Sequence, residues 1–271
     1  MLTLICGLLT GIAVFFALYK GVRMDEVWSV IFAVAAMFLF QFGVMMILRR
    51  VSARINSRLQ ALMAETQEKL RAMQNRFMRH PGGSQKMMMQ AMEREQNAGL
   101  QKMIDALELY KPLYLWNLLM KKQVNTMRML FLFQMRRFDE ADALMDKCLF
   151  MDVQSVCVKM ARMYKNGQDK ALIDKFFRRK GARFKGQDSL LPFSLYAWIL
   201  VRQDRIDDAI KVLAQAKIKT NDNEVVVKNW EMLVNGKVKH FSNSQLGEAW
   251  YALLLEEPKI PKVQQQVRYR R

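Results

Sequence analysis

Two long runs without a charged residue open the chain. Residues 2–19 form a run of 18 uncharged residues, and residues 27–48 form one of 22 that only Ser29 and Gln41 make slightly polar. At a rise of 1.5 Å per residue, helices of these lengths reach about 27 Å and 33 Å, close to a hydrocarbon core of about 30 Å. Backbone groups in lipid must bond within their own segment, so each run is predicted to be a transmembrane α-helix.

The charges beside the two runs predict how the hairpin faces. The connector 20–26 carries two basic and two acidic residues, whereas four arginines follow the second run: Arg49, Arg50, Arg54 and Arg58. By the positive-inside rule this arginine cluster stays cytoplasmic, which also places the N-terminus and the downstream chain inside. Tyr19 and Trp28 then fall at the outer interface, where aromatic belts form. The predicted location is a membrane of the bacterial inner-membrane type.

Two other structures for the N-terminal region are less favoured. A cleaved signal peptide carries Lys or Arg before its apolar stretch and an A-x-A-like site after it, and residues 1–19 show neither. A buried hairpin in a soluble protein does not explain 22 uncharged residues that end in Arg-Arg, a stop-transfer pattern. Gly7 and Gly11 form a G-x-x-x-G pattern, which favours close packing of the first span on the second.

Residues 49–80 are predicted to form a basic amphipathic helix. Its stripe repeats at steps of three or four: Ile55, Leu59, Leu62, Thr66, Leu70, Met73 and Phe77. The other faces carry eight basic and two acidic residues. Three uses stay open: the first turns lie along an anionic leaflet, the stripe self-associates or pairs with a partner helix, or it packs on the downstream domain. The segment His80-Pro-Gly-Gly-Ser84 ends the helix.

Further along, a turn residue is followed three times by small and large apolar residues at fixed steps. The copies are Arg136, Ala141, Met145, Cys148; Gly167, Leu172, Phe176; and Asp204, Ala209, Leu213, Ala216. In the second copy Arg179 takes the last, small position. The pattern resembles the second half of a tetratricopeptide repeat in degenerate form. That resemblance implies an array of α-hairpins over residues 113–255, with a partner segment along the helices near Ala141 to Ala216.

The C-terminal part of this array contains a conflict between two patterns. Residues 230–241 alternate about Asn235-Gly236, which is typical of a β-hairpin. A helix that ends at Val234 is nevertheless favoured, because Val226, Trp230, Leu233 and Val234 share a helical face and glycine can follow a helix end. Ser242 or Ser244 is then expected to cap a last helix through Leu255.

Composition limits the chemistry that the chain can perform. The 43 Lys and Arg against 25 Asp and Glu give a net charge of +18, and residues 1–48 contribute none of it. The two histidines and three cysteines show no metal-ligand or catalytic spacing, and the 22 methionines fit apolar packing. No phosphate-binding loop, dinucleotide fingerprint or hydrolase motif is present, so neither an enzyme nor a cofactor is expected, and no metal site.

Together these patterns predict an all-α protein of four parts. They are a transmembrane hairpin at 1–48, a juxtamembrane helix at 49–80, a tetratricopeptide-like helical domain at 85–256 and a flexible basic tail at 257–271. The expected role is an adaptor or scaffold on the cytoplasmic membrane face, with the lipid bilayer and unidentified proteins as partners. The alternative is electrostatic binding of RNA, ribosomes or anionic lipid by the juxtamembrane helix and tail. No sequence-specific nucleic-acid motif supports a nucleic-acid partner.

Overall fold

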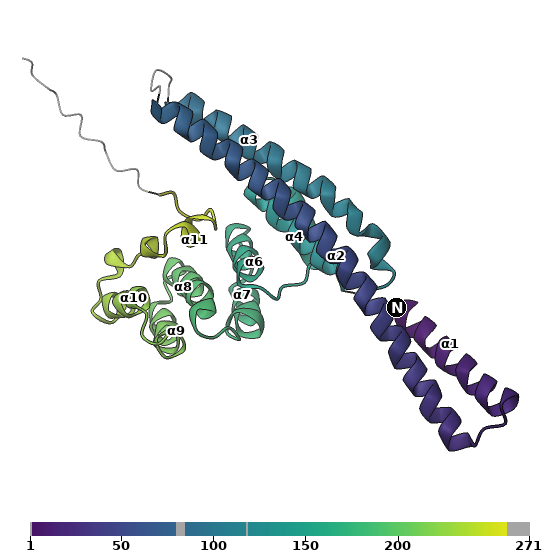
Figure 1. The fold of residues 1–271 in the computed structure, drawn as a ribbon. Coiled ribbons are helices and arrows are strands. Elements are labelled where there is room, and N and C mark those ends of the chain that lie inside the picture. The colour runs from purple at the N-terminus through teal and green to yellow at the C-terminus, as the bar shows by residue number, and fades with distance from the viewer. Residues whose placement is uncertain (1, 80–84, 118, 259–271) are drawn as a thin grey trace, which may run out of the picture. The chain divides into compact units, whose positions relative to one another are not determined.

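The computed structural model describes residues 2–79, 85–117 and 119–258, and every regular element in these ranges is helical (Figure 1). The all-α prediction is thus confirmed for the described residues. The chain forms two compact units, residues 1–149 and 150–271, and each is treated by itself. The helical domain expected at 85–256 is therefore divided, and its first part belongs to the unit of the N-terminal helices. Most of the predicted tail lies outside the described residues.

The first unit begins with a helical hairpin. Helix α1 (Leu2–Phe16) continues into one π-helical turn, η1 (Ala17–Gly21), and α2 (Glu26–Arg79) returns beside it. Helix α2 has 54 residues and is about 81 Å long at 1.5 Å per residue. The second predicted span and the predicted juxtamembrane helix are thus one uninterrupted helix, because no Pro or Gly lies between Gly43 and Arg79.

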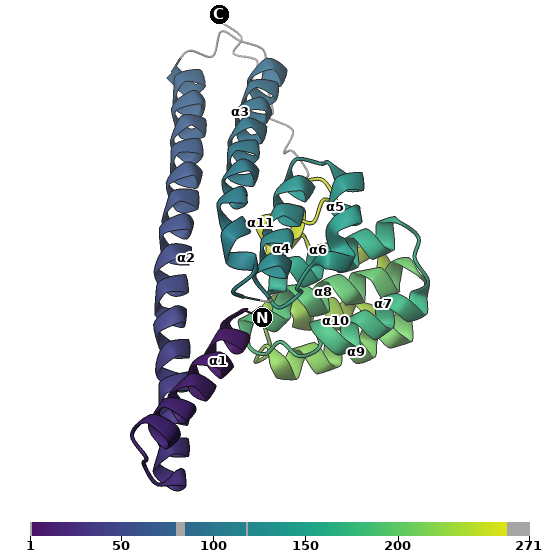
Figure 2. The same cartoon turned by 90° about the vertical axis from the view of Figure 1, so that its right-hand side faces the viewer.

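Four further helical elements and one single-turn 3₁₀ segment complete the first unit. They are α3 (Gln85–Ala106), η2 (Leu107–Tyr114), α4 (Met120–Gln134), α5 (Phe138–Leu144) and η3 (Met145–Lys147). Helix α3 runs antiparallel to the distal part of α2 (Figure 2). The core between α2, α3, η2 and α4 consists of Ile55, Leu59, Leu100, Met103, Leu107, Tyr110, Leu113, Met120 and Val124.

A glycine sets the close approach of α2 and α3. A Cβ atom on Gly99 would lie 2.3 Å from Thr66 Oγ1, so only glycine fits opposite this threonine. Nearer the hairpin, the Tyr110 hydroxyl donates a hydrogen bond of 2.6 Å to Asn56 Oδ1. Burial raises the pKa of Tyr110, so its hydroxyl stays protonated and remains a donor.

The second unit is built from antiparallel helices around α8. Its elements are α6 (Val153–Lys165), α7 (Lys170–Phe176), η4 (Phe177–Gly181), α8 (Gln187–Arg202), α9 (Ile206–Lys219), α10 (Glu224–Val234), η5 (Val238–His240), η6 (Ser244–Leu246) and α11 (Glu248–Tyr251). Residues 192–200 of α8 are buried without exception, which makes α8 the central element of this unit. Side chains of Asp152, Asp169 and Asn223 cap α6, α7 and α10 at their N-termini.

The C-terminal part of the second unit confirms one sequence prediction and contradicts another. Helix α10 ends at Val234 and Gly236 follows with a φ of +68°, so the helical interpretation of residues 230–234 is confirmed. The expected long helix through Leu255 is wrong, because Gly247 with a φ of +61° separates the short turn η6 from the four-residue α11. Neither Ser242 nor Ser244 caps α11; Gly247 occupies that position without a side-chain bond.

Candidate functional site

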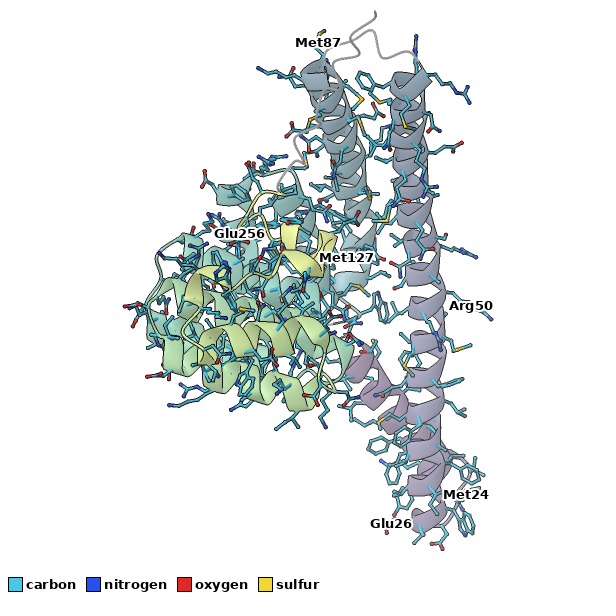
Figure 3. All side chains as sticks on the ribbon, turned by 90° about the vertical axis from the view of Figure 1, so that its left-hand side faces the viewer. Met24, Glu26, Arg50, Met87, Met127 and Glu256 are labelled. Atoms are coloured by element: carbon cyan, nitrogen blue, oxygen red, sulfur yellow. The ribbon has the colours of Figure 1, made fainter. Side chains whose placement is uncertain are left out.

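The predicted interface aromatics lie at the closed end of the hairpin. Tyr19 in η1 is 44% exposed and Trp28 in the first turn of α2 is 56% exposed. Met24 and Glu26 mark this end of the molecule in Figure 3. The Tyr19 ring stacks on Phe15 with 5.6 Å between centroids, so part of its ring surface is covered within the hairpin.

The G-x-x-x-G pattern of the first run is used inside the hairpin. Gly7 and Gly11 are the buried residues of α1. A Cβ atom on Gly7 would lie 3.2 Å from the Gln41 side chain, and one on Gly11 would lie 3.3 Å from the Ala33 carbonyl oxygen. These glycines therefore let α1 approach the backbone of α2, as the pattern predicts.

All four residues of the arginine cluster are exposed on α2. None has a carboxylate partner among the described residues, and no Asp or Glu occurs from Val27 to Ala64. Arg50 points away from the other helices of its unit in Figure 3. The cluster thus forms an uncompensated positive surface at the point where the uncharged part of α2 ends.

A groove lies beside Arg49, between the first turn of α1, the middle of α2 and the segment before α4. We call it the Trp116 groove, and its volume is about 560 Å³. It is lined by Thr3, Leu4, Gln41, Met45, Leu48, Arg49, Ser52, Trp116, Asn117 and Met120. The start of α1 is tied to this segment by two hydrogen bonds: the Leu2 N–H donates to Leu115 O at 3.2 Å, and the Thr3 hydroxyl to Trp116 O at 3.3 Å. No local sequence pattern indicates this groove, since residues 3 and 116 meet only through the tertiary fold.

The apolar stripe of the juxtamembrane helix is used within the chain. Ile55 and Leu59 are 7% and 6% exposed, and they pack on residues of α3, η2 and α4. Met127 of α4, labelled in Figure 3, packs against the same core. Of the three uses that the sequence left open, packing on the downstream segment is therefore the one observed.

The turn residues of the three predicted repeats share one backbone conformation. Arg136, Gly167 and Asp204 have φ values of +59°, +64° and +60°, and Gly236 adds a fourth turn. At each turn, the N–H groups of the turn residue and of the residue after it donate to carbonyl groups of the preceding helix, which is the Schellman pattern. For example, Arg136 N donates to Phe133 O at 3.0 Å, and Arg137 N donates to Leu132 O at 2.9 Å. The same helix end thus recurs at intervals of 31, 37 and 32 residues.

Most of the predicted repeat-packing residues are buried. Ala141, Met145, Ala209, Leu213 and Ala216 are at most 4% exposed. Cys148 is half-buried, and its thiol donates to Leu144 O at 3.2 Å. Gly167 is an exposed turn residue, as its place in the pattern requires.

The middle copy follows a different register from the predicted one. Leu172 is 51% exposed and Phe176 only half-buried, whereas Ile173 and Phe177 are 1% and 3% exposed. The cause is local: Asp169 caps α7, which begins three residues after its turn, whereas α5 and α9 begin two residues after theirs. The π-helical segment η4 then inserts one more residue, which brings the buried Gly181, not Arg179, to the small position.

One face of α8 is covered by the chain's own C-terminal segment. The Trp198 and Trp250 indole N–H groups donate to Glu256 Oε1 and Oε2 at 2.8 and 2.9 Å. Arg202 donates to the same Oε1 at 3.2 Å, and Asn243 donates to Ser194 O at 2.9 Å. Burial disfavours the ionised Glu256 carboxylate, but the hydrogen bonds from Trp250, Trp198 and Arg202 outweigh burial and lower the pKa of Glu256.

A second polar cluster joins α7, α8 and α9. Asp174 accepts hydrogen bonds from the Tyr196 hydroxyl at 2.7 Å and from Arg205 at 3.0 Å. Burial opposes ionisation of Asp174, yet the bonds from Arg205 and Tyr196 lower its pKa overall. Desolvation and the Asp174 carboxylate raise the pKa of Tyr196, so this hydroxyl is held as a donor and does not serve as a base. The cluster is satisfied internally and therefore holds helices together.

The other groups that could take part in chemistry are dispersed. Burial raises the pKa of the Cys157 thiol, which keeps it protonated and unreactive. His240 is exposed at the end of η5, and His80 lies outside the described residues. Within the described ranges, no three or more His, Cys, Asp or Glu side chains gather as a metal site would require. Comparison of the chain with protein-family models, curated proteins and solved structures finds no match.

Proposed function

We propose that this protein is a membrane-anchored helical-repeat adaptor, and that α1 with η1 and the first half of α2 cross the bilayer as a hairpin. By length and composition both helices can span a membrane. Only 6% of the apolar window of each helix is buried inside the protein, whereas a soluble core helix is mostly buried. Large side chains such as Leu9, Phe38 and Leu39 are 60% to 72% exposed, and lipid is the solvent that favours such a surface.

The charge distribution supports an orientation for this hairpin. Tyr19 and Trp28 mark its closed end, and the unpaired arginine cluster follows its open end. Aromatic residues favour both interfaces, but Lys and Arg favour the cytoplasmic one. We therefore propose that the N-terminus, the part of the first unit beyond Leu48 and the second unit are cytoplasmic, and that the membrane is of the bacterial inner-membrane type.

The recurring turns support a tetratricopeptide-like array as the binding part of the adaptor. Helix pairs α4–α5, α6–α7 and α8–α9 each meet at a Schellman turn with small residues packed nearby. Arrays of this kind offer extended surfaces to protein segments. Because residues 243–256 already cover one face of α8, a partner segment binds at another face or displaces this one.

A second candidate function is electrostatic binding of an anionic surface: RNA, ribosomes or anionic lipid. The unpaired arginine cluster and the net charge of +18 favour it. Self-association through the stripe of α2 is a weaker proposal, since Ile55 and Leu59 are already covered within the chain.

The membrane anchor is tested by alkaline carbonate extraction of vesicles that contain the full chain. We expect the chain to stay in the membrane pellet and a chain without residues 2–48, the matched control, to be released. A reporter fused after Arg271 is expected to be cytoplasmic. Release of the full chain, or an extracytoplasmic reporter, contradicts the proposal.

The adaptor role is tested by cross-linking the full chain in membranes and identifying the captured partners by mass spectrometry. Proteins captured by the full chain in 0.15 M salt, and lost when residues 150–258 are deleted, support it. Capture of RNA alone, with binding that falls steeply between about 50 and 200 mM salt, favours the second candidate function instead.

A further inference from the structure

We infer that the Trp116 groove binds one anionic phospholipid of the cytoplasmic leaflet. The inference deepens the proposed function and rests on it, because the groove meets a leaflet only if α1 and α2 span the membrane. It differs from a diffuse attraction of lipid to the arginine cluster, since it assigns the headgroup to one arginine and one cavity.

Beyond the polar Gln41, whose side chain lies against Gly7, the lining of the groove changes from apolar to polar along α2. Met45 and Leu48 belong to the last turns of the uncharged run, and Arg49 and Ser52 follow them directly. Leu4 adds apolar surface from α1. A phospholipid has the same order of chemistry along the membrane normal: acyl chains, then glycerol, then phosphate. The groove therefore matches a lipid that keeps its normal depth in the leaflet.

The polar part of the lining is rich in donors and has no acid. Arg49 supplies a guanidinium with no carboxylate partner among the described residues, and its planar fork suits two phosphate oxygens. Ser52, Trp116 and Asn117 add hydroxyl, indole and amide N–H or O–H groups. No Asp or Glu lines the groove. These are the features that an anionic headgroup requires.

The size of the groove suits one lipid headgroup region. Its volume of about 560 Å³ falls within the range of about 300–1,000 Å³ that is common for small-molecule sites. A soluble phosphate would leave the apolar side at Leu4 and Met45 unfilled. A phospholipid fills both the apolar and the polar side of the groove, and its concentration in the leaflet is high. A phospholipid is therefore the occupant that we propose.

The experiment compares two neighbouring arginines in the full-length protein. The protein is placed in nanodiscs of phosphatidylcholine with one quarter phosphatidylglycerol, and lipids retained on the released protein are counted by native mass spectrometry. Arg49→Gln removes the groove arginine. Arg50→Gln is the matched control, because it removes the same charge at the same depth from a side chain that does not line the groove. Ser52→Phe fills the groove without changing charge.

We expect the unaltered chain to retain one phosphatidylglycerol in preference to phosphatidylcholine. Arg49→Gln is expected to lower this retention about tenfold, because it removes at least one hydrogen bond between a guanidinium and the phosphate. Arg50→Gln should change it less than about twofold, and Ser52→Phe should abolish it.

Three results overturn the inference. They are equal losses in Arg49→Gln and Arg50→Gln, which indicate diffuse attraction; equal retention of both lipids; and displacement of the lipid by inorganic phosphate. Carbonate extraction of the same preparations separates the two proposals. If the chain is released, the membrane anchor fails and this site with it; if the chain is integral but retains no lipid selectively, only this site fails.

Discussion

Replacement of Glu256 by Gln is expected to destabilise the second unit by about 2 to 4 kcal/mol. One carboxylate accepts bonds from Trp198 at 2.8 Å, Trp250 at 2.9 Å and Arg202 at 3.2 Å. A glutamine has one oxygen, so its NH₂ group must face one of the indole N–H donors. The buried donor that loses its acceptor costs about 1–3 kcal/mol, and the remaining bonds lose their charge assistance.

The assay is guanidinium unfolding of the full chain in detergent, followed by tryptophan fluorescence. Part of the signal is local, because Trp198 and Trp250, two of the five tryptophans, meet edge to face with 5.7 Å between centroids. Glu257→Gln is the matched control, since Glu257 is the adjacent, exposed carboxylate. Equal unfolding free energies for Glu256→Gln and Glu257→Gln, within about 0.5 kcal/mol, would show that the Glu256 carboxylate does not stabilise the second unit through these bonds.

The same carboxylate gives a pH dependence with a definite sign. The pKa of Glu256 is lower in the folded protein than its ordinary value of 4.5, because its hydrogen bonds favour the ionised form more than burial disfavours it. Its contribution is therefore complete above pH 4.5 and is lost as the pH falls through the folded-state pKa. The difference in stability between the unaltered chain and Glu256→Gln should shrink on acidification. A difference that stays constant from pH 7 to pH 3 contradicts this assignment.

Three other substitutions test separate parts of the fold by thermal unfolding of the full chain in detergent. Gly11→Leu should destabilise the hairpin by about 2 kcal/mol or more because it forces α1 away from α2, and Gly43→Leu, where no atom lies within 4 Å of an added Cβ, should not. Tyr110→Phe should cost about 1 kcal/mol through its lost bond to α2, whereas Tyr114→Phe should cost less than half of that. Asp174→Asn should cost about 2 kcal/mol, because the buried Tyr196 hydroxyl and the half-buried Arg205 guanidinium lose a charged acceptor. No loss of stability would mean that this cluster is solvated in solution.

The sequence predicts the parts of this fold that depend on local rules. Uncharged runs and steps of three or four residues locate α1 and α2 well, and Gly236 correctly indicates the end of α10. Two of the three turn residues are not glycine, yet Arg136 and Asp204 adopt the same positive φ as Gly167. At Arg136 and Asp204 the helix end is therefore recognisable from the alanine five residues later and not from the type of the turn residue itself.

The register of α7 could not be predicted because the apolar residues come in pairs. Leu172-Ile173 and Phe176-Phe177 satisfy a helical pattern in either register, and a single extra turn residue decides between them. The Trp116 groove and the Glu256 cluster depend on contacts across 113 and 58 residues of chain, which no local pattern contains.

Because α2 is one unbroken helix, a rotation of its first half also displaces its distal end. The part beyond Leu48 has 31 residues and extends about 46 Å, with α3 bound along it as a brace. If α2 is anchored in a bilayer as proposed, a tilt of about 10°, which is small beside the tilts that membrane helices adopt, moves the distal end sideways by about 8 Å. In that arrangement, a change in bilayer thickness at one end of the helix would change the position of the other end without any hinge.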